Sequence, residues 1–116
     1  MTDRRLFELH AEVCKVLANP WRLELIDLLR SGERSLRELV EKLGVPVANV
    51  SQHLNIMRGR GIVAVRREGS RSFYRLTDPD IVKAFDIMRG ILRKQLVATG
   101  ALAGAIPRSR TRGRSR

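Results

Sequence analysis

The chain has little of several residue types that mark particular protein classes. Among its 116 residues are one cysteine, two histidines and few aromatic residues. A single cysteine excludes a disulfide within the chain but still allows one between two copies. No apolar run approaches the roughly 20 residues that a membrane-spanning helix needs, and the N-terminal residues do not form a secretory signal. We therefore expect a cytoplasmic protein with no membrane partner.

The side chains that catalysis commonly uses are also scarce in this sequence. Nucleophilic and acid–base catalysis need a nucleophile or a carboxylate placed beside a base. Two histidines, one thiol and no close cluster of acids with a base provide no such constellation. We therefore expect that the protein is not an enzyme and uses no cofactor.

Acidic residues are far fewer than basic residues. Lysine and arginine number 23 against 12 acidic residues, a net charge of +11, which indicates a polyanionic partner. By itself the charge fits DNA, RNA or an anionic membrane surface. Five arginines alternate with small residues at the C-terminus: Arg108, Arg110, Arg112, Arg114 and Arg116. We expect residues 1–98 to form one domain and residues 99–116 to form a basic, disordered tail.

Helical periodicity and capping signals divide the first sixty residues into helices. Apolar residues at three- and four-residue intervals predict an amphipathic helix over residues 4–18. Asn19 followed by Pro20 is typical of a helix start. Ser35 and Glu38 have the spacing of a capping box, which predicts a short third helix ending at Gly44. A fourth helix should follow Pro46, with an inward row of Val47, Val50, Leu54 and Met57.

Two short helices joined by a tight turn with a glycine are typical of a helix-turn-helix. Residues 62–67 and 71–76 favour strands and flank a glycine turn, so they predict a β-hairpin, or wing. Asp78-Pro79 opens a last amphipathic helix that extends to about Leu96. The expected fold is mainly α with a β-hairpin wing, a winged helix-turn-helix.

The fourth helix has the side chains expected of a helix that reads DNA bases. The second helix of a helix-turn-helix lies in the major groove, where Asn and Gln can pair with adenine and Ala can contact a thymine methyl group. No charged residue occurs from Val45 to Met57, whereas an ordinary solvated helix face, the alternative, would carry Glu and Lys. The candidate base-reading residues are Ala48, Asn49, Ser51, Gln52 and Asn55.

Arginines gather directly after this helix. Between residues 58 and 75 there are six arginines and one acid, a pattern that matches a wing lying along DNA phosphates, although a charge run can also be a solvated face. The candidate phosphate contacts are His53, Arg58, Arg66, Arg67, Arg71 and Arg75. For His53 a hydrogen bond within the domain is an equal alternative to a phosphate or base contact.

These elements together resemble the ArsR/SmtB winged-helix repressors. The resemblance is carried by residues 17–25, the helix leading into Gly44, Val50-Ser51-Gln52-His53-Leu54, Gly61-Ile62-Val63 and the wing. It covers most of residues 10–97. It implies a homodimer formed through the first and last helices that binds double-stranded DNA at an inverted repeat and represses transcription until an inducer releases it.

The chain departs from this family's metal-sensing patterns. The third helix begins without a cysteine pair and the last helix has no histidine, so neither familiar metal site can form and the inducer is unknown. Cys14 and His10 lie four residues apart on one helix face. They are candidates for thiol or redox sensing, or for metal binding across a dimer. The alternative is a small buried Cys14 beside a partly covered His10.

A second function remains open at this point. A nonspecific architectural DNA-binding protein, or an RNA-binding protein, would rely mainly on the arginine-rich tail. The two functions differ in whether binding to a preferred sequence survives deletion of Arg108 to Arg116.

Overall fold

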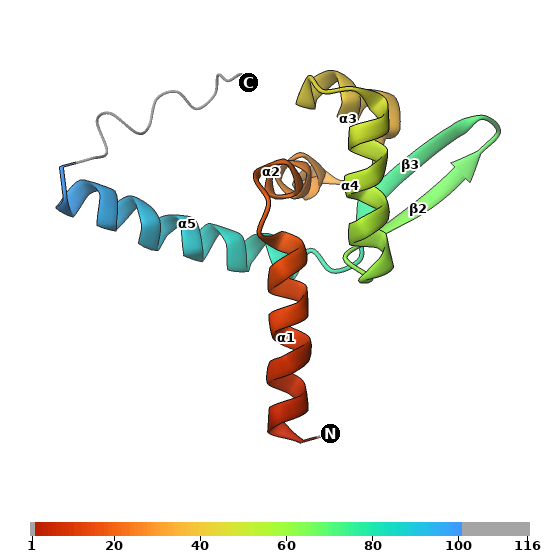
Figure 1. Cartoon of the computed structure of the whole chain (residues 1–116). Coiled ribbons are helices and arrows are strands. Elements are labelled where there is room, and N and C mark those ends of the chain that lie inside the picture. Colours follow the sequence, from red (N-terminus) through yellow and green to blue (C-terminus); the bar gives the residue numbers. More distant parts are fainter. Residues whose placement is uncertain (1, 101–116) are drawn as a thin grey trace. The chain divides into compact units, whose positions relative to one another are not determined.

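The computed structural model describes residues 2–100 (Figure 1), and the chain divides into two compact units, the first ending at Pro79 and the second beginning at Asp80. The tail expected over residues 99–116 lies almost wholly outside the described residues. The first unit contains α1 (Asp3–Leu17), α2 (Pro20–Leu28), the 3-10 turn η1 (Leu29–Ser31), β1 (Arg34–Ser35), α3 (Leu36–Leu43), α4 (Val47–Gly59), β2 (Val63–Glu68) and β3 (Arg71–Leu76). The second unit contains α5 (Asp80–Ala98).

Local capping signals determine where the helices of the first unit begin and end. The side chain of Asn19 accepts hydrogen bonds from the backbone N–H groups of Trp21 and Arg22, 2.9 and 3.2 Å long, directly before the proline that opens α2. Ser35 and Glu38 form the predicted capping box, with bonds of 3.1 and 3.0 Å. These caps satisfy backbone donors that a helix start otherwise leaves without partners, and both predictions are confirmed.

The core lies between α2, α3, α4 and the hairpin. Its most deeply buried side chains, each less than 2% exposed, are Leu25, Ile26, Leu39, Val50, Leu54, Met57 and Val63. Three of them belong to the predicted inward row of α4. The fourth member of that row was wrongly predicted, because Val47 is 53% exposed. Pro46 is the N-cap of α4, so Val47 is the first helical residue and lies beyond the edge of the core.

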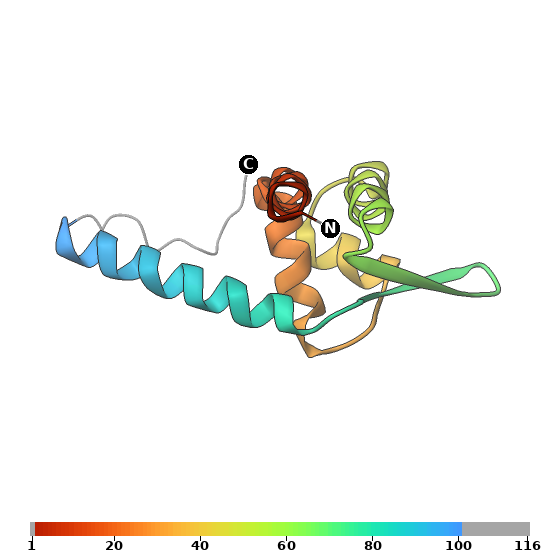
Figure 2. The same ribbon diagram turned by 90° about the horizontal axis from the view of Figure 1, so that it is seen from below.

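The predicted hairpin is present as part of a three-stranded antiparallel sheet of order β1-β3-β2. Glu68 pairs with Arg71 across a two-residue turn in which Gly69 has a φ of +62°. The hairpin extends from the helical core beside α4 (Figure 2). The short strand β1 pairs with β3 at Tyr74 and Phe73. It has only two residues, too few to produce a recognisable alternation in the sequence.

The helices α1 and α5 differ from the others because neither contains a buried residue. Phe7 on α1 is 67% exposed, and on α5 Ile87 and Met88 are 67% and 61% exposed. Large apolar side chains that are exposed on a helix in this way are typical of a binding face, and this holds for α1 and α5 separately. No helix within residues 2–100 combines the length and the hydropathy needed to cross a membrane.

Gly44 enables the tight turn between α3 and α4. Its φ of +74° lies in the left-handed region, although a Cβ there would meet no atom within 4 Å. We expect Gly44→Ala to lower the free energy of unfolding by about 1–2 kcal/mol, the cost of a left-handed L-residue. Gly59→Ala is the matched control, because Gly59 is helical with equally open surroundings and should gain up to about 1 kcal/mol. Urea unfolding at one protein concentration measures both; equal effects would contradict this account.

Candidate nucleic-acid interface

The exposed face of α4 carries uncharged polar side chains. Val50, Leu54 and Met57 are fully buried and fix the orientation of the helix. The predicted base-reading residues precede or alternate with these anchors: Ala48, Asn49, Gln52 and Asn55 are exposed and Ser51 is half-buried. The helix therefore presents amide and methyl groups that could approach base edges, with no long charged side chain before Arg58.

Four of the predicted phosphate-binding arginines are exposed at the end of α4 and along the hairpin: Arg58, Arg67, Arg71 and Arg75. The Arg67 guanidinium donates to Ser72 Oγ at 2.8 Å, and that of Arg71 lies 5.2 Å from the centre of the Phe73 ring. Within residues 2–100, none of the four forms an ion pair with a carboxylate. Apart from the attraction between Arg75 and the carboxylate of Glu33, their charge is therefore available to an external anion.

Arg66 is arranged differently from the other hairpin arginines. Its guanidinium donates twice to the carboxylate of Glu33, at 2.8 and 3.2 Å, and stacks 4.5 Å from the centre of the Phe73 ring. A second carboxylate, that of Glu68, lies 3.5 Å away. The hydrogen bond from Arg66 is the main reason why the pKa of Glu33 is lowered. We therefore expect Arg66 to hold the hairpin against the segment before β1 and to contribute little phosphate affinity.

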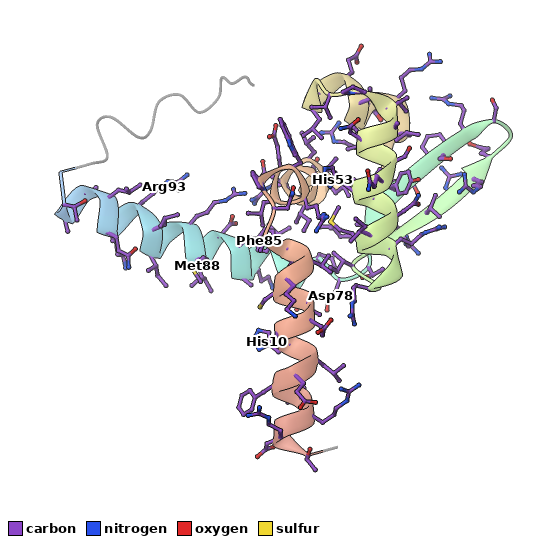
Figure 3. The ribbon with its side chains drawn as sticks, viewed as in Figure 1. His10, His53, Asp78, Phe85, Met88 and Arg93 are labelled. Carbon is purple, nitrogen blue, oxygen red and sulfur yellow. The ribbon has the colours of Figure 1, made fainter. Side chains whose placement is uncertain are left out.

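His53 is held within the domain. The Nε of Arg22 donates to His53 Nδ1 at 3.2 Å, while Nη1 of the same arginine donates to the backbone carbonyl of Val16 at 2.8 Å. His53 is half-buried on α4 (Figure 3). Burial, and secondly the charge of Arg22, lower its pKa. This geometry favours the hydrogen-bonding alternative over a phosphate contact, and it links the end of α1 to α4 through one arginine.

The lowered pKa of His53 gives a pH prediction. Because the folded state resists protonation, the unfolded chain binds more protons once the pH falls through the ordinary histidine pKa of about 6.5. Stability should therefore decrease as the pH falls from about 7 to about 5. We expect His53→Gln, which keeps an acceptor but does not titrate, to flatten the pH dependence of the melting temperature over this range. His10→Gln removes the other histidine, an exposed one, and should leave the dependence intact; the reverse pattern would contradict the assignment.

Comparisons with known proteins agree with this geometry. The family model described as "Bacterial regulatory protein, arsR family" matches residues 19–65, from the start of α2 into β2. The HTH-type transcriptional regulator Rv0081 of Mycobacterium tuberculosis is 36% identical over 97 residues, which span 83% of this chain and 85% of the relative. The chain belongs to the ArsR family of bacterial regulatory proteins. The predicted family is thus confirmed.

Solved structures of ArsR-type proteins share the fold. The crystal structure of Rv0081 superposes with a TM-score of 0.74, covering 83% of this chain and 97% of the other. A homodimeric winged helix-turn-helix domain from Mycobacterium bovis has a TM-score of 0.71 at 33% identity, covering 83% of this chain and 91% of the other. The Biofilm growth-associated repressor of Xylella fastidiosa is 41% identical over 68 residues, or 59% of this chain and 60% of the repressor. The predicted winged helix-turn-helix fold is confirmed.

The candidate sensing residues of this ArsR-family chain lie on α1. Cys14 and His10 are both exposed and line a shallow hollow of about 530 Å³ with Phe7 and Lys15. The expectation of a buried Cys14 is therefore wrong for the single chain, because the helix face that carries it is uncovered. Among the residues the structure describes, no group of three or more His, Cys, Asp and Glu side chains could hold a metal. A sensing role for Cys14 stays a prediction.

Proposed function

We propose that this ArsR-family regulator represses transcription by binding double-stranded DNA as a homodimer at an inverted-repeat operator. The observation that carries the proposal is the uncharged, exposed face of α4 beside the arginines of the hairpin. Such a protein acts where the DNA lies, in the cytoplasm, and needs neither a catalytic site nor a cofactor. Its inducer is unknown.

In this proposal the uncharged face of α4 and the arginines that follow it have different roles. Asn49, Gln52 and Asn55 discriminate between bases in the major groove, helped by Ala48 and Ser51. Arg58, Arg67, Arg71 and Arg75 bind phosphates, which adds affinity and salt dependence without sequence choice. The helices are rigidly anchored by the core, so the reading side chains are held at a defined angle to the hairpin.

The dimer is supported by the exposed apolar residues on α1 and α5. Leu6 and Phe7 on α1, and Ile87, Met88 and Leu92 on α5, are each more than half exposed in the single chain. A two-fold axis would pair identical faces of two subunits and place the two copies of α4 about 34 Å apart, in successive major grooves. The homodimeric domain from Mycobacterium bovis and the repressor from Xylella fastidiosa support the same assembly and the same activity.

Binding to the DNA upstream of the protein's own gene tests this function. We expect the full chain to protect one inverted repeat there and to prefer it to a scrambled duplex by a factor of roughly 10³ or more at physiological salt. Fluorescence anisotropy with the two duplexes measures the preference. Equal affinity for both sequences would refute sequence-specific repression.

The arginine-rich C-terminus favours one other candidate, a nonspecific architectural or RNA-binding protein. Under the proposed function, residues 1–98 are the DNA-binding domain and residues 99–116 only add affinity. Deleting residues 108–116 should then lower the affinity for all nucleic acids but keep the operator preference. Loss of essentially all binding would favour the other candidate.

A further inference from the structure

The helix α1 is attached to the rest of its unit with little apolar burial. None of its residues is buried, and Val13, Val16 and Leu17 in its last two turns are only half-buried. Three fully buried side chains, by contrast, anchor α4 in the core. Partly exposed apolar contacts are not directional, so they fix the angle of a helix poorly. The angle between α1 and α4 must therefore depend on other contacts.

Arg22, in the first turn of α2, joins the end of α1 to the middle of α4. Its Nη1 donates to the backbone carbonyl of Val16 at 2.8 Å, and its Nε donates to His53 Nδ1 at 3.2 Å. Val16 lies in the last turn of α1, where the carbonyls have no partner inside the helix. Because the guanidinium is planar and its donors point in fixed directions, one half-buried arginine holds the end of α1 at a defined position beside α4.

A second polar bridge lies one turn earlier on α1. Nη2 of Arg60, the C-cap residue of α4, donates to Glu12 Oε1 at 2.7 Å. The two helices run in opposite directions in Figure 1 and are both seen end-on in Figure 2. Two separated bridges fix the direction of a helix, whereas one alone would act as a pivot. The side chains of this second pair are 40% and 45% exposed, so solvent weakens it and Arg22 is the stronger tie.

The direction of α1 matters because the residues that the proposed dimer covers lie farther out on it. At 1.5 Å per residue, Phe7 lies about 14 Å along the helix from Val16. A tilt of about 15° would therefore displace Phe7 by about 3.5 Å. This displacement is comparable with the rise of one DNA base pair, about 3.4 Å. The two bridges are thus placed to control where the second copy of α4 lies to within about one base pair.

We propose that Arg22, helped by the pair of Glu12 and Arg60, sets the spacing between half-sites that the dimer accepts. Arg22 is a positioning residue, because it acts on operator choice by holding α1 against His53 and not by touching a base. The inference rests on the proposed function, since it requires a homodimer that binds an inverted repeat. It assigns part of the operator specificity to residues away from the base-reading face of α4.

Duplexes in which the two half-sites are moved closer or farther apart by one base pair test this role. We expect the parent to lose at least about 10-fold in affinity on either change, because avidity is lost when the geometry prevents both contacts. Arg22→Met keeps an unbranched chain but no donor. A loosened α1 lets the two copies of α4 adapt, so the loss should shrink to about threefold or less. Anisotropy with the full chain measures the profile, and a duplex with a single half-site should bind parent and variant nearly alike.

Exchanging the charges of the second bridge gives a test that does not depend on the Arg22 variant. Glu12→Arg alone should flatten the spacing profile, because two cations then face each other. Adding Arg60→Glu should restore the profile, since the pair is formed again with the charges reversed. Glu8→Arg is the matched control, because Glu8 pairs within α1 and not with α4. It should keep the profile of the parent, and sedimentation velocity should show that all variants are dimers.

A profile for Arg22→Met or Glu12→Arg as sharp as that of the parent would overturn the assignment. So would a double variant that stays flat, or a Glu8→Arg control as flat as Glu12→Arg. The proposed function fails by a different result, equal affinity of the parent for operator and scrambled DNA. The two failures are therefore distinguishable.

Discussion

Replacing Met88 and Leu92 together by glutamate is expected to leave the protein monomeric and to lower its operator affinity by at least about 100-fold. The two side chains lie one turn apart on α5 and are 61% and 51% exposed. In a dimer they would be covered, and covering two unpaired carboxylates costs more than the apolar contacts provide. A monomer binds one half-site and loses the avidity of two linked half-sites, which is typically 10²–10⁴.

The control for this experiment is Arg93→Glu, which changes the net charge by the same amount. Met88 and Arg93 extend from different sides of α5 (Figure 3). Sedimentation velocity gives the assembly state and anisotropy gives the operator affinity. We expect the control to stay dimeric. A Met88 and Leu92 variant that remains a dimer, or a monomer that keeps full operator affinity, would contradict the proposed assembly.

Asn49→Ala and Gln52→Ala are each expected to reduce the preference for operator over scrambled DNA. A good bidentate contact to the correct base contributes about 1–3 kcal/mol of discrimination, or roughly 5- to 150-fold. The loss should appear mainly in operator binding, since neither side chain carries the charge that binds DNA without regard to sequence. Titration of both duplexes at one salt concentration measures this ratio.

A comparison with Arg71→Ala shows whether base reading and phosphate anchoring are carried by different residues. Arg71→Ala should weaken binding to both duplexes about equally and leave their ratio unchanged. If Asn49→Ala, Gln52→Ala and Arg71→Ala all lowered both affinities by one common factor, the division between reading and anchoring residues would be wrong.

The features that the sequence predicted well are those decided over a few residues. Asn19 with Pro20, Ser35 with Glu38 and the left-handed Gly44 each satisfy a local backbone requirement, so their spacing alone identifies the helix ends. The β-favouring residues on both sides of the glycine turn at Gly69 indicated the hairpin in the same way. Because these signals occur in the order of a helix-turn-helix followed by a wing, the fold could be predicted before any tertiary contact was known.

The features that the sequence did not predict depend on contacts between distant segments. Arg66 was expected to bind phosphate because the sequence shows its charge but not its bidentate partner Glu33, 33 residues earlier. Likewise, the bond from Arg22 to His53 spans 31 residues. Val47 continued the apolar spacing of α4 but lies beyond the edge of the core. Periodicity describes a helix face and does not show where the neighbouring elements end.

The interface itself was only partly predictable. The uncharged face of α4 could be read from residue types, since a helix that reads bases must not carry long charged side chains there. The contribution of each hairpin arginine could not, because it depends on the carboxylates near the folded hairpin, such as that of Glu33 beside Arg66.

Binding to an operator in which every purine is replaced by its 7-deaza analogue tests most directly whether α4 reads the major groove. This change removes the N7 acceptors there and leaves the phosphates and the minor groove intact. The account predicts that the parent loses most of its preference for the operator, while the variant with both Asn49→Ala and Gln52→Ala binds the natural and substituted duplexes alike. Equal affinity of the parent for the two duplexes would contradict it.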